Sequence, residues 1–274
     1  MISPDIYQLF KKNSKTYFTS SLFFPRDVQD KIATLYAFVR TADNFVDTLP
    51  QQKKEFLAFE KEYYAVRSGK KTKQPILQLF SKLETEEQFD TGWTDAFLAS
   101  MKMDLTKKTY TSLAETESYI YGSANVIGLY IAKILHLPQT SYHYAELLGK
   151  SMQFMNFIRD INEDIQLGRN YFPQEDMKRF SLQSLDYQET REKPEQFCRF
   201  VQFQIQRYNQ WQKEAEKGFQ YIPKRYLTPI KTASEMYKWT SAIIQKDPFI
   251  VYRKKIKPSY ARIVSTAFLI WLKK

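Results

Sequence analysis

Apolar residues recur every three or four positions along most of the chain, which is the pattern of helices that each bury one face. The expected helices span roughly residues 4–12, 27–48, 52–67, 75–84, 90–106, 113–136, 139–167, 174–180, 193–218, 226–245 and 258–272. The breaks between them are short, and none is a long Ser/Gly linker. We therefore predict an all-α fold, a helical bundle that forms a single domain over residues 1–274.

The composition supports long helices with short connections. Only seven of the 274 residues are glycine, against a usual level of roughly 7%, which disfavours turn-rich β folds and nucleotide folds built on glycine loops. The one cysteine, Cys198, cannot form an intramolecular disulfide, and His136 and His143 lie far from any cysteine cluster. A zinc site is therefore not expected, and the cysteine usage fits a reducing cytoplasm.

The net charge of +11 allows three kinds of partner: nucleic acid, an anionic membrane surface or an anionic small substrate. The lysines are scattered and form no nucleic-acid motif, so we expect no nucleic-acid partner; a solvated basic surface without a partner is the plain alternative. No secretory signal is visible, and the apolar segment Ile263–Leu272 is too short to span a bilayer. We expect it mainly to close the core, or alternatively to lie in a membrane interface.

A first polar stripe runs through the apolar segment LYAFVRTADNFVD. Tyr36, Arg40, Asp43 and Asp47 follow the spacing i, i+4, i+7, i+11, which places them on one face of a helix. Polar groups in so apolar a helix must face a metal, a ligand or a partner charge.

A second stripe, about 117 residues later, consists of Gln153, Asn156, Asp160 and Asp164. Carboxylates one helical turn apart, roughly 6 Å along the axis, can hold a line of hard cations. Magnesium fits because it takes a few carboxylate oxygens and fills its other positions with water and substrate phosphate. A single DxxxD is usually a surface feature, whereas two such stripes facing each other across one cavity are what departure of a diphosphate requires.

Two further segments have alternative interpretations. The loop Gly168–Pro173 could bring Arg169 and Tyr171 to the metal end, or simply cap a helix. The small residues of Tyr119–Gly128 could line a tunnel for an apolar ligand, or let helices pack closely. The 44 aromatic residues share this ambiguity, because they suit a core as well as a tunnel wall that stabilises carbocations.

At these residues the chain resembles the squalene and phytoene synthase family. The motifs are YAFVRTADNFVD, YIYGSANVIG and QFMNFIRDINEDIQLGRNYFP, the last of which is close to QxxNxxRDxxED followed by GRxYxP. The resemblance covers nearly the whole chain and is greatest to bacterial and archaeal phytoene synthases. It implies the isoprenoid-synthase fold, a helical bundle around a central cavity, and a prenyl transferase of the head-to-head type.

The resemblance also implies roles for individual residues. The metal ligands would be Asp43, Asp47, Asn156, Asp160 and Asp164. The catalytic set would be the four aspartates with Arg40 and Tyr36. The substrates would contact Asn13, Ser14, Thr16, Tyr17, Tyr36, Arg40, Tyr119, Ser123, Ala124, Gly128, Gln153, Asn156, Arg159, Arg169 and Tyr171.

The sequence departs from the family pattern in three places. Asn44 stands at the second position of the usual DDxxD, off the stripe of Asp43 and Asp47, so we expect metal binding to survive with altered strength. In the segment Tyr119–Gly128, the family's usual Ala-Gly pair is replaced by Ala124-Asn125. A C-terminal tyrosine of the family aligns with Phe249.

The implied reaction joins two prenyl diphosphates through a cyclopropane intermediate, with Mg²⁺ as cofactor and Mn²⁺ as its alternative. We expect phytoene from two geranylgeranyl diphosphates, a step of carotenoid biosynthesis. Squalene or dehydrosqualene from farnesyl diphosphate is the alternative, and NADPH is expected only for squalene. From another class, a relative without activity could serve as a binding or assembly protein. We also expect a cytoplasmic location, peripheral contact with a membrane, and a downstream phytoene desaturase as partner.

Overall fold

The computed structural model describes residues 4–273, with the backbone alone for Pro4, Asp5 and Asn13. Every regular element in this range is a helix, and the one β-type contact is an isolated bridge between Tyr110 and Pro173. The all-α prediction is confirmed.

The helices have the following bounds in chain order: α1 (Pro4–Asn13), α2 (Lys15–Ser21), α3 (Arg26–Asp47), α4 (Lys53–Arg67), α5 (Pro75–Glu86), α6 (Thr91–Met103), α7 (Leu113–Ile120), the π-helix η1 (Tyr121–Asn125), α8 (Val126–Ile134), the 3₁₀ turn η2 (Gln139–Ser141), α9 (Tyr142–Arg159), α10 (Ile161–Gln166), α11 (Gln174–Arg179), α12 (Tyr187–Glu192), α13 (Pro194–Glu216), the 3₁₀ turn η3 (Lys217–Tyr221), α14 (Lys224–Lys246), α15 (Ile250–Arg253) and α16 (Tyr260–Leu272).

The structure differs from the expected pattern mainly in short elements. Helices α2, α12 and α15 were not predicted, because one or two turns carry too little periodicity to be recognised. The helix expected over 113–136 contains the π-helix η1, and the one expected over 139–167 is interrupted at Asp160. Both interruptions lie at the cavity described below, where irregular helical turns are common.

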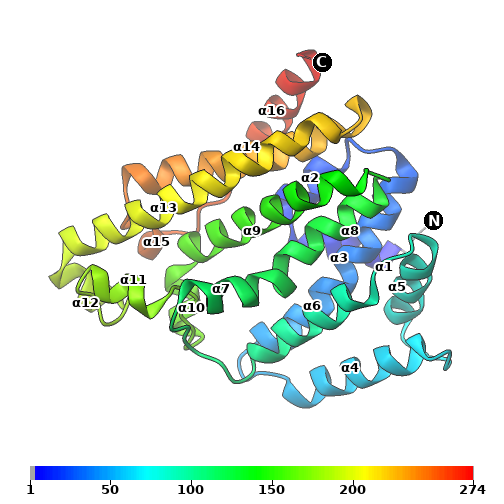
Figure 1. Ribbon diagram of the computed structural model, residues 1–274, viewed down its shortest axis with the longest axis horizontal. Helices are drawn as coiled ribbons and strands as arrows, with labels where there is room; N and C mark the ends of the chain where they lie inside the picture. The colour runs from blue at the N-terminus through cyan, green and yellow to red at the C-terminus, as the bar shows by residue number, and fades with distance from the viewer. Residues whose placement is uncertain (1–3, 274) are drawn as a thin grey trace.

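The long helices pack as a bundle, with α9 near its centre (Figure 1). Helix α9 contacts α8, α13 and α14, and α3 contacts α1, α4, α5 and α6. Two apolar clusters form the core. One is built around Phe38 and Phe80 in the N-terminal half, and the other around Phe154, Phe197 and Phe200 in the C-terminal half. Side chains of both clusters contribute walls to one internal cavity.

Two glycines set the close approach of the helices on one side of this cavity. A Cβ atom on Gly128 would lie 2.1 Å from the carbonyl oxygen of Ala145, and one on Gly149 would lie 2.2 Å from that of Ala124. Any larger residue would push α8 or η1 away from α9. The small residues of Tyr119–Gly128 therefore serve packing, and Ser123, Ala124 and Gly128 line the cavity as well.

Helix α16 lies on the outside of the bundle and contacts α14 and α2 (Figure 1). Only Ile263 and Ala267 of this helix are buried. The expectation that this segment mainly closes the core is therefore wrong, since one narrow face packs and the rest stays exposed. Across residues 4–273, the structure contains no helix that combines the length and the apolar character needed to cross a membrane.

Candidate active site

One large cavity of about 1030 Å³ runs through the bundle. Ordinary small-molecule pockets measure roughly 300–1,000 Å³, so this one suits a long ligand or two ligands together. One end, which we call the acidic end, is formed by Asp43, Asp47, Asp104, Asp160 and Asp164. Most of the remaining wall is aliphatic or aromatic, including Leu35, Ile127 and Ile131.

The first acidic pair lies on the uninterrupted helix α3. Tyr36, Arg40, Asp43 and Asp47 all line the cavity, as expected for residues of one helical face. The Arg40 guanidinium lies 3.9 Å from Asp43 Oδ2, too far for a strong ion pair. Burial, and then the negative charge of Asp47, raise the pKa of Asp43 to about 8. Arg40 therefore does not hold the Asp43 carboxylate ionised.

The second acidic pair lies where α9 ends and α10 begins. Arg159 donates two hydrogen bonds to Asp160, at 2.8 Å from Nε and 2.5 Å from Nη2. Burial raises the pKa of Asp164 well above its usual range, and the charges of Asp160 and Asp47 raise it further. Because Asp47 belongs to α3, the two acidic pairs face one another across the cavity.

Arg169 connects the first pair with the loop that follows the second. Gly168, at φ +69°, ends the helical segment in the left-handed region, and the next residue turns back into the bundle. Arg169 is only 4% exposed, and it donates to Asp47 Oδ1 at 2.8 Å and to the Val46 carbonyl oxygen at 2.5 Å. The loop Gly168–Pro173 therefore both caps the helix and places the Arg169 guanidinium at the acidic end.

Asp104 is a residue of the site that the sequence did not reveal. It is 2% exposed, and its two carboxylate oxygens accept hydrogen bonds from the hydroxyls of Tyr119 (2.6 Å) and Tyr171 (2.8 Å). Arg169 Nη1 lies 3.9 Å away, and burial raises the pKa of Asp104 to about 6. Asp104 is a lone acid at the end of α6, so no motif marks it. It also holds Tyr119 at the acidic end.

Lys255 is a second residue that the sequence did not reveal. Its Nζ atom lies 3.5 Å from Asp160 Oδ1 and forms an ion pair with Glu163, and all three residues line the cavity. The segment between α15 and α16 thus supplies a cation to the second pair from more than 90 residues away in the sequence. No local pattern could have indicated this contact.

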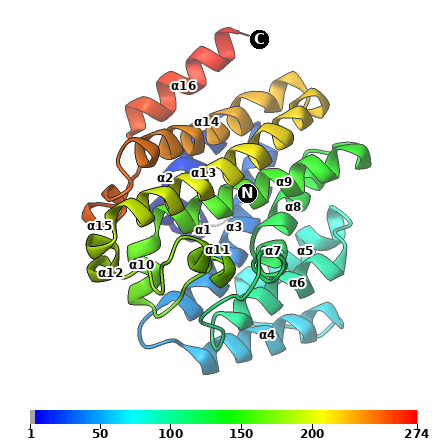
Figure 2. The ribbon, with the colours of Figure 1, turned by 60° about the vertical axis from the view of Figure 1, so that its left-hand side comes forward.

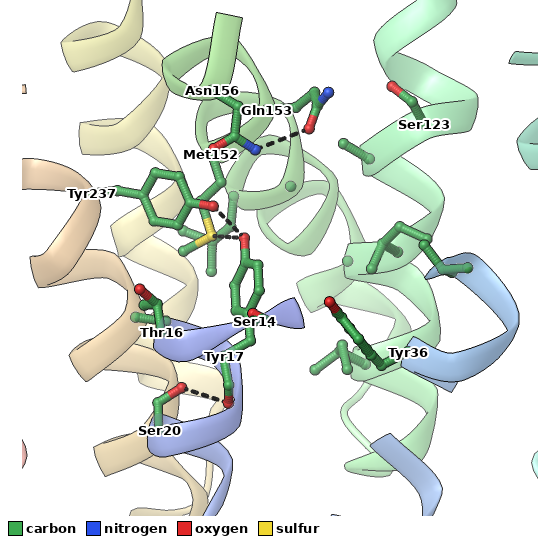
Figure 3. A pocket seen from close by; sticks show the side chains of 18 of the residues that line it. Ser14, Thr16, Tyr17, Ser20, Tyr36, Ser123, Met152, Gln153, Asn156 and Tyr237 are labelled. Carbon is green, nitrogen blue, oxygen red and sulfur yellow. Dashed lines mark hydrogen bonds between the residues drawn. The ribbon is translucent and has the colours of Figure 1, made fainter. Parts of the chain in front are cut away.

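Two tyrosine hydroxyls meet inside the cavity, 2.7 Å apart (Figure 3). They belong to Tyr17 of α2 and Tyr237 of α14, and the Tyr17 hydroxyl also lies 3.7 Å from the sulfur of Met152. Burial raises the pKa of Tyr17 well above its usual range, so its hydroxyl stays neutral. The expected C-terminal tyrosine position, Phe249, instead packs against Phe197 in the core. Tyr237 and Tyr260 are the tyrosines of the C-terminal region that line the cavity.

The predicted site residues with described side chains all line this one cavity. They are Ser14, Thr16, Tyr17, Tyr36, Arg40, Asp43, Asp47, Tyr119, Ser123, Ala124, Gly128, Gln153, Asn156, Arg159, Asp160, Asp164, Arg169 and Tyr171. The side chain of Asn13 lies outside the described part of the chain. Asn44 is absent from the cavity wall, in agreement with its position off the stripe. The individual roles of these residues stay predictions.

The donor set at the acidic end fits magnesium. Asn156 donates from Nδ2 to Gln153 Oε1 at 3.1 Å, which leaves its buried Oδ1 atom without a hydrogen-bond donor (Figure 3). An amide oxygen beside carboxylates is a typical ligand of a hard cation. Across residues 4–273, no three His, Cys, Asp or Glu side chains lie close enough together to hold an ion. Water and substrate phosphate would have to complete the coordination.

Two phytoene synthases are similar to this chain in sequence. The 15-cis-phytoene synthase of Synechocystis sp. is 24% identical over 270 residues, which cover 90% of this chain and 78% of that protein. The 15-cis-phytoene synthase of Pantoea ananas is 24% identical over 237 residues, covering 82% of this chain and 76% of that protein.

Among solved structures, a dehydrosqualene synthase in complex with a ligand superposes with a TM-score of 0.86 at 23% identity, covering 98% of this chain and 95% of the other. Squalene synthase HpnC from Alicyclobacillus acidocaldarius gives a TM-score of 0.79 at 21% identity, covering 89% and 93%. These structures show that the fold is shared. The profile of the family described as Squalene/phytoene synthase matches residues 10–262. With that match over nearly its whole length, the chain belongs to the squalene/phytoene synthase family of prenyl transferases.

Proposed function

We propose that this enzyme joins two prenyl diphosphates head to head with release of diphosphate, and that its substrates are two geranylgeranyl diphosphates and its product phytoene. The observation that carries the proposal is the meeting of Asp43 and Asp47 with Asp160 and Asp164 at one end of a long apolar cavity. Acidic ligands for metal-bound diphosphate and an apolar space for prenyl chains are what such a reaction needs.

The proposal assigns magnesium to Asp43, Asp47, Asn156, Asp160 and Asp164. When bound there, the metal would neutralise the negative charge that grows on the departing diphosphate. Arg40 has a buried Nε atom without an acceptor, so it can turn to a phosphate oxygen. Lys255 and Arg159, which neutralise Asp160 without substrate, are placed to contact a diphosphate that arrives with its own cations.

The apolar wall serves the carbocations that the reaction forms after diphosphate departs. Water would trap such a cation, and the aliphatic and aromatic side chains of the wall offer water few hydrogen-bond partners. The aromatic faces available near the acidic end include Tyr36 and Phe157, and ring faces stabilise cations. Burial raises the pKa of Tyr17 well above its usual range, so its hydroxyl stays neutral inside the wall and adds no competing anion.

The C20 substrate is favoured because the relatives found by sequence are phytoene synthases. Farnesyl diphosphate is the second candidate, because the similar solved structures include a dehydrosqualene synthase and a squalene synthase. NADPH would be needed only if squalene were the product. A C30 or C40 hydrocarbon is insoluble in water, so the proposal includes a peripheral contact with a membrane, and a desaturase acting on phytoene there as a downstream partner.

One competition experiment tests the proposal. The purified protein is incubated with Mg²⁺ and an equal mixture of farnesyl and geranylgeranyl diphosphate, and products are identified by mass spectrometry while free diphosphate is measured. We expect a C40 hydrocarbon as the main product. A C30 hydrocarbon would move the assignment to the farnesyl substrate. No diphosphate release from either substrate would favour a binding or assembly protein that has lost activity.

A further inference from the structure

The exposed apolar surface of this protein is concentrated on its last helix. Of the thirteen large apolar side chains that are exposed among the described residues, six lie on α16. Phe268, Leu269, Trp271 and Leu272 are each between 54% and 58% exposed. Phe268, Leu269 and Leu272 lie on the side of α16 that faces away from the buried residues Ile263 and Ala267, and Trp271 lies at the border of the buried face, one turn after Ala267. Both views of the ribbon show α16 as the outermost helix beyond α14 (Figures 1 and 2).

The segment that carries this surface is basic. From Pro248 to the end of the chain there are seven lysines and arginines and no aspartate or glutamate. Two of the seven, Arg253 and Lys255, form ion pairs with acids that precede this segment. Arg262 in the first turn of α16 and Lys273, the residue that caps its C-terminal end, lie beside the exposed apolar side. An apolar helix face bordered by cations complements an anionic lipid surface, where apolar groups enter the acyl region and cations meet head groups.

The helix also begins at the wall of the active-site cavity. Lys257, Pro258 and Tyr260 line that cavity, and α16 starts at Tyr260. The Tyr260 ring lies under Lys15 of α2, with 4.3 Å between Nζ and the ring centroid, and α16 contacts α2. If α16 bound to a surface, one wall of the active-site cavity would therefore lie close to that surface.

We propose that α16 is an in-plane docking helix that binds the enzyme to an anionic membrane surface through Phe268, Leu269, Trp271 and Leu272. The helix has 13 residues, a length of about 20 Å, against a hydrocarbon thickness of about 30 Å, so it lies on the membrane and does not cross it. A second copy of the chain is the less suitable occupant, because its own Arg262 and Lys273 would be brought against those of the first copy. This inference rests on the proposed membrane contact and gives it a location.

Vesicle flotation tests the docking surface. The full chain is mixed with vesicles of phosphatidylcholine alone or with about 30% phosphatidylglycerol, a composition that gives an anionic surface of the kind that attracts basic segments. We expect binding to the anionic vesicles that weakens as salt is raised. The triple variant Phe268→Ser, Trp271→Ser, Leu272→Ser should bind roughly tenfold or more weakly. The matched control Tyr64→Ser, Tyr187→Ser, which removes exposed rings elsewhere, should bind like the parent protein.

Tryptophan fluorescence provides a second readout that does not need the triple variant to fold. Trp271 is 58% exposed, so its emission should shift to the blue on vesicle binding and be quenched by lipids brominated in the acyl chains. The single variant Trp271→Phe should lose most of that shift while it still floats with the vesicles. An unchanged shift in this variant would mean that another surface binds.

Three outcomes would overturn the proposal: a parent protein that ignores anionic vesicles, a triple variant that binds like the parent, or a triple variant that only converts a dimer into a monomer in sedimentation. The last result would assign α16 to a second copy of the chain. Failure here and failure of the proposed reaction are distinguishable, because flotation uses no substrate. None of the three substituted residues lines the cavity, so diphosphate release in detergent should be the same in parent and triple variant.

Discussion

The two acidic pairs differ in how their charge is balanced. Asp43 and Asp47 lie on the continuous helix α3, and their strongest cation, Arg169, arrives from a loop 122 residues away in the sequence. Asp160 lies at a helix break and is held by Arg159, its immediate neighbour in the chain. The second pair is therefore organised locally, whereas the first depends on the assembled tertiary structure.

This difference has an electrostatic consequence. Asp43 has only Arg40 at 3.9 Å, and burial beside Asp47 raises its pKa to about 8. Asp160 already has two short hydrogen bonds from a guanidinium. Each pair therefore has one carboxylate without a close cation, Asp43 in the first and Asp164 in the second, and burial raises the pKa of both. We expect these two carboxylates to gain the most when magnesium and diphosphate enter.

The largest expected effect comes from breaking the second pair. Asp160→Ala removes a carboxylate from the acidic end, and turnover should fall roughly a thousandfold or more because charge on the leaving diphosphate loses its neutralisation. Diphosphate release measures the change, and far-UV circular dichroism should still report a helical protein. Glu195→Gln, which removes an exposed acid far from the cavity, is the control. Full activity of Asp160→Ala would contradict the metal assignment.

A smaller effect is expected from removing the long-range partner of the first pair. Arg169→Gln leaves Asp47 and buried Asp104 without their guanidinium, and should reduce activity roughly a hundredfold and stability by about 3 kcal/mol. A double-mutant cycle with Asp47→Asn, followed by urea unfolding and diphosphate release, should show strong coupling. Additive effects of the two substitutions would show that the Arg169–Asp47 contact does not organise the site.

The pH dependence of stability sharpens the comparison. In the ligand-free protein the pKa values of Asp43 and Asp104 are raised to about 8 and about 6, against about 3.9 for an unfolded aspartate. The folded state holds these protons more tightly, so their stabilising contribution is complete below pH about 4 and is lost as pH rises through about 8. Asp43→Asn should reduce the loss by about 1–2 kcal/mol.

Urea unfolding between pH 5 and pH 9 measures this difference, with Glu195→Gln again as the control. The ligand-free parent protein should be less stable at the higher pH, and Asp43→Asn should lose less stability over that interval than the parent. Parallel pH profiles of the parent and Asp43→Asn would contradict the assignment of the titration to the first pair.

The smallest effect is expected at Asn44, the departure from the family pattern. Asn44 does not line the cavity, so Asn44→Asp, which restores the usual DDxxD, should change activity by less than about threefold. A steady-state titration of Mg²⁺ with both proteins checks this. A large gain in activity or metal affinity would show that the position takes part in binding and that the stripe is wider than the structure suggests.

The sequence was sufficient for the parts of the site that follow helical spacing. Asp43 and Asp47, one turn apart in an apolar helix, were placed correctly on one wall, and so was the GRNYFP loop with Arg169. The long helices were also predictable, because their apolar faces repeat over many turns.

Contacts between distant segments were not predictable. Asp104 and Lys255 stand in no motif. Their place at the acidic end arises only when α6 packs against α3 and η1, and when the end of α15 packs against α10. Tyr237 was missed because a tyrosine on an apolar helix looks like any core residue. The exposure of α16 was not predicted for a related reason: the sequence of an apolar helix does not show whether another helix covers it.

The proposed function requires that both acidic pairs act together on one metal-bound diphosphate. The decisive measurement is diphosphate release from geranylgeranyl diphosphate as Mg²⁺ is titrated, in the parent protein and in Asp47→Asn and Asp160→Ala. We expect diphosphate release to require Mg²⁺, to stop with excess chelator, and to fall at least a hundredfold when either pair is broken. Release that persists without metal, or in either variant at the parent's rate, would contradict it.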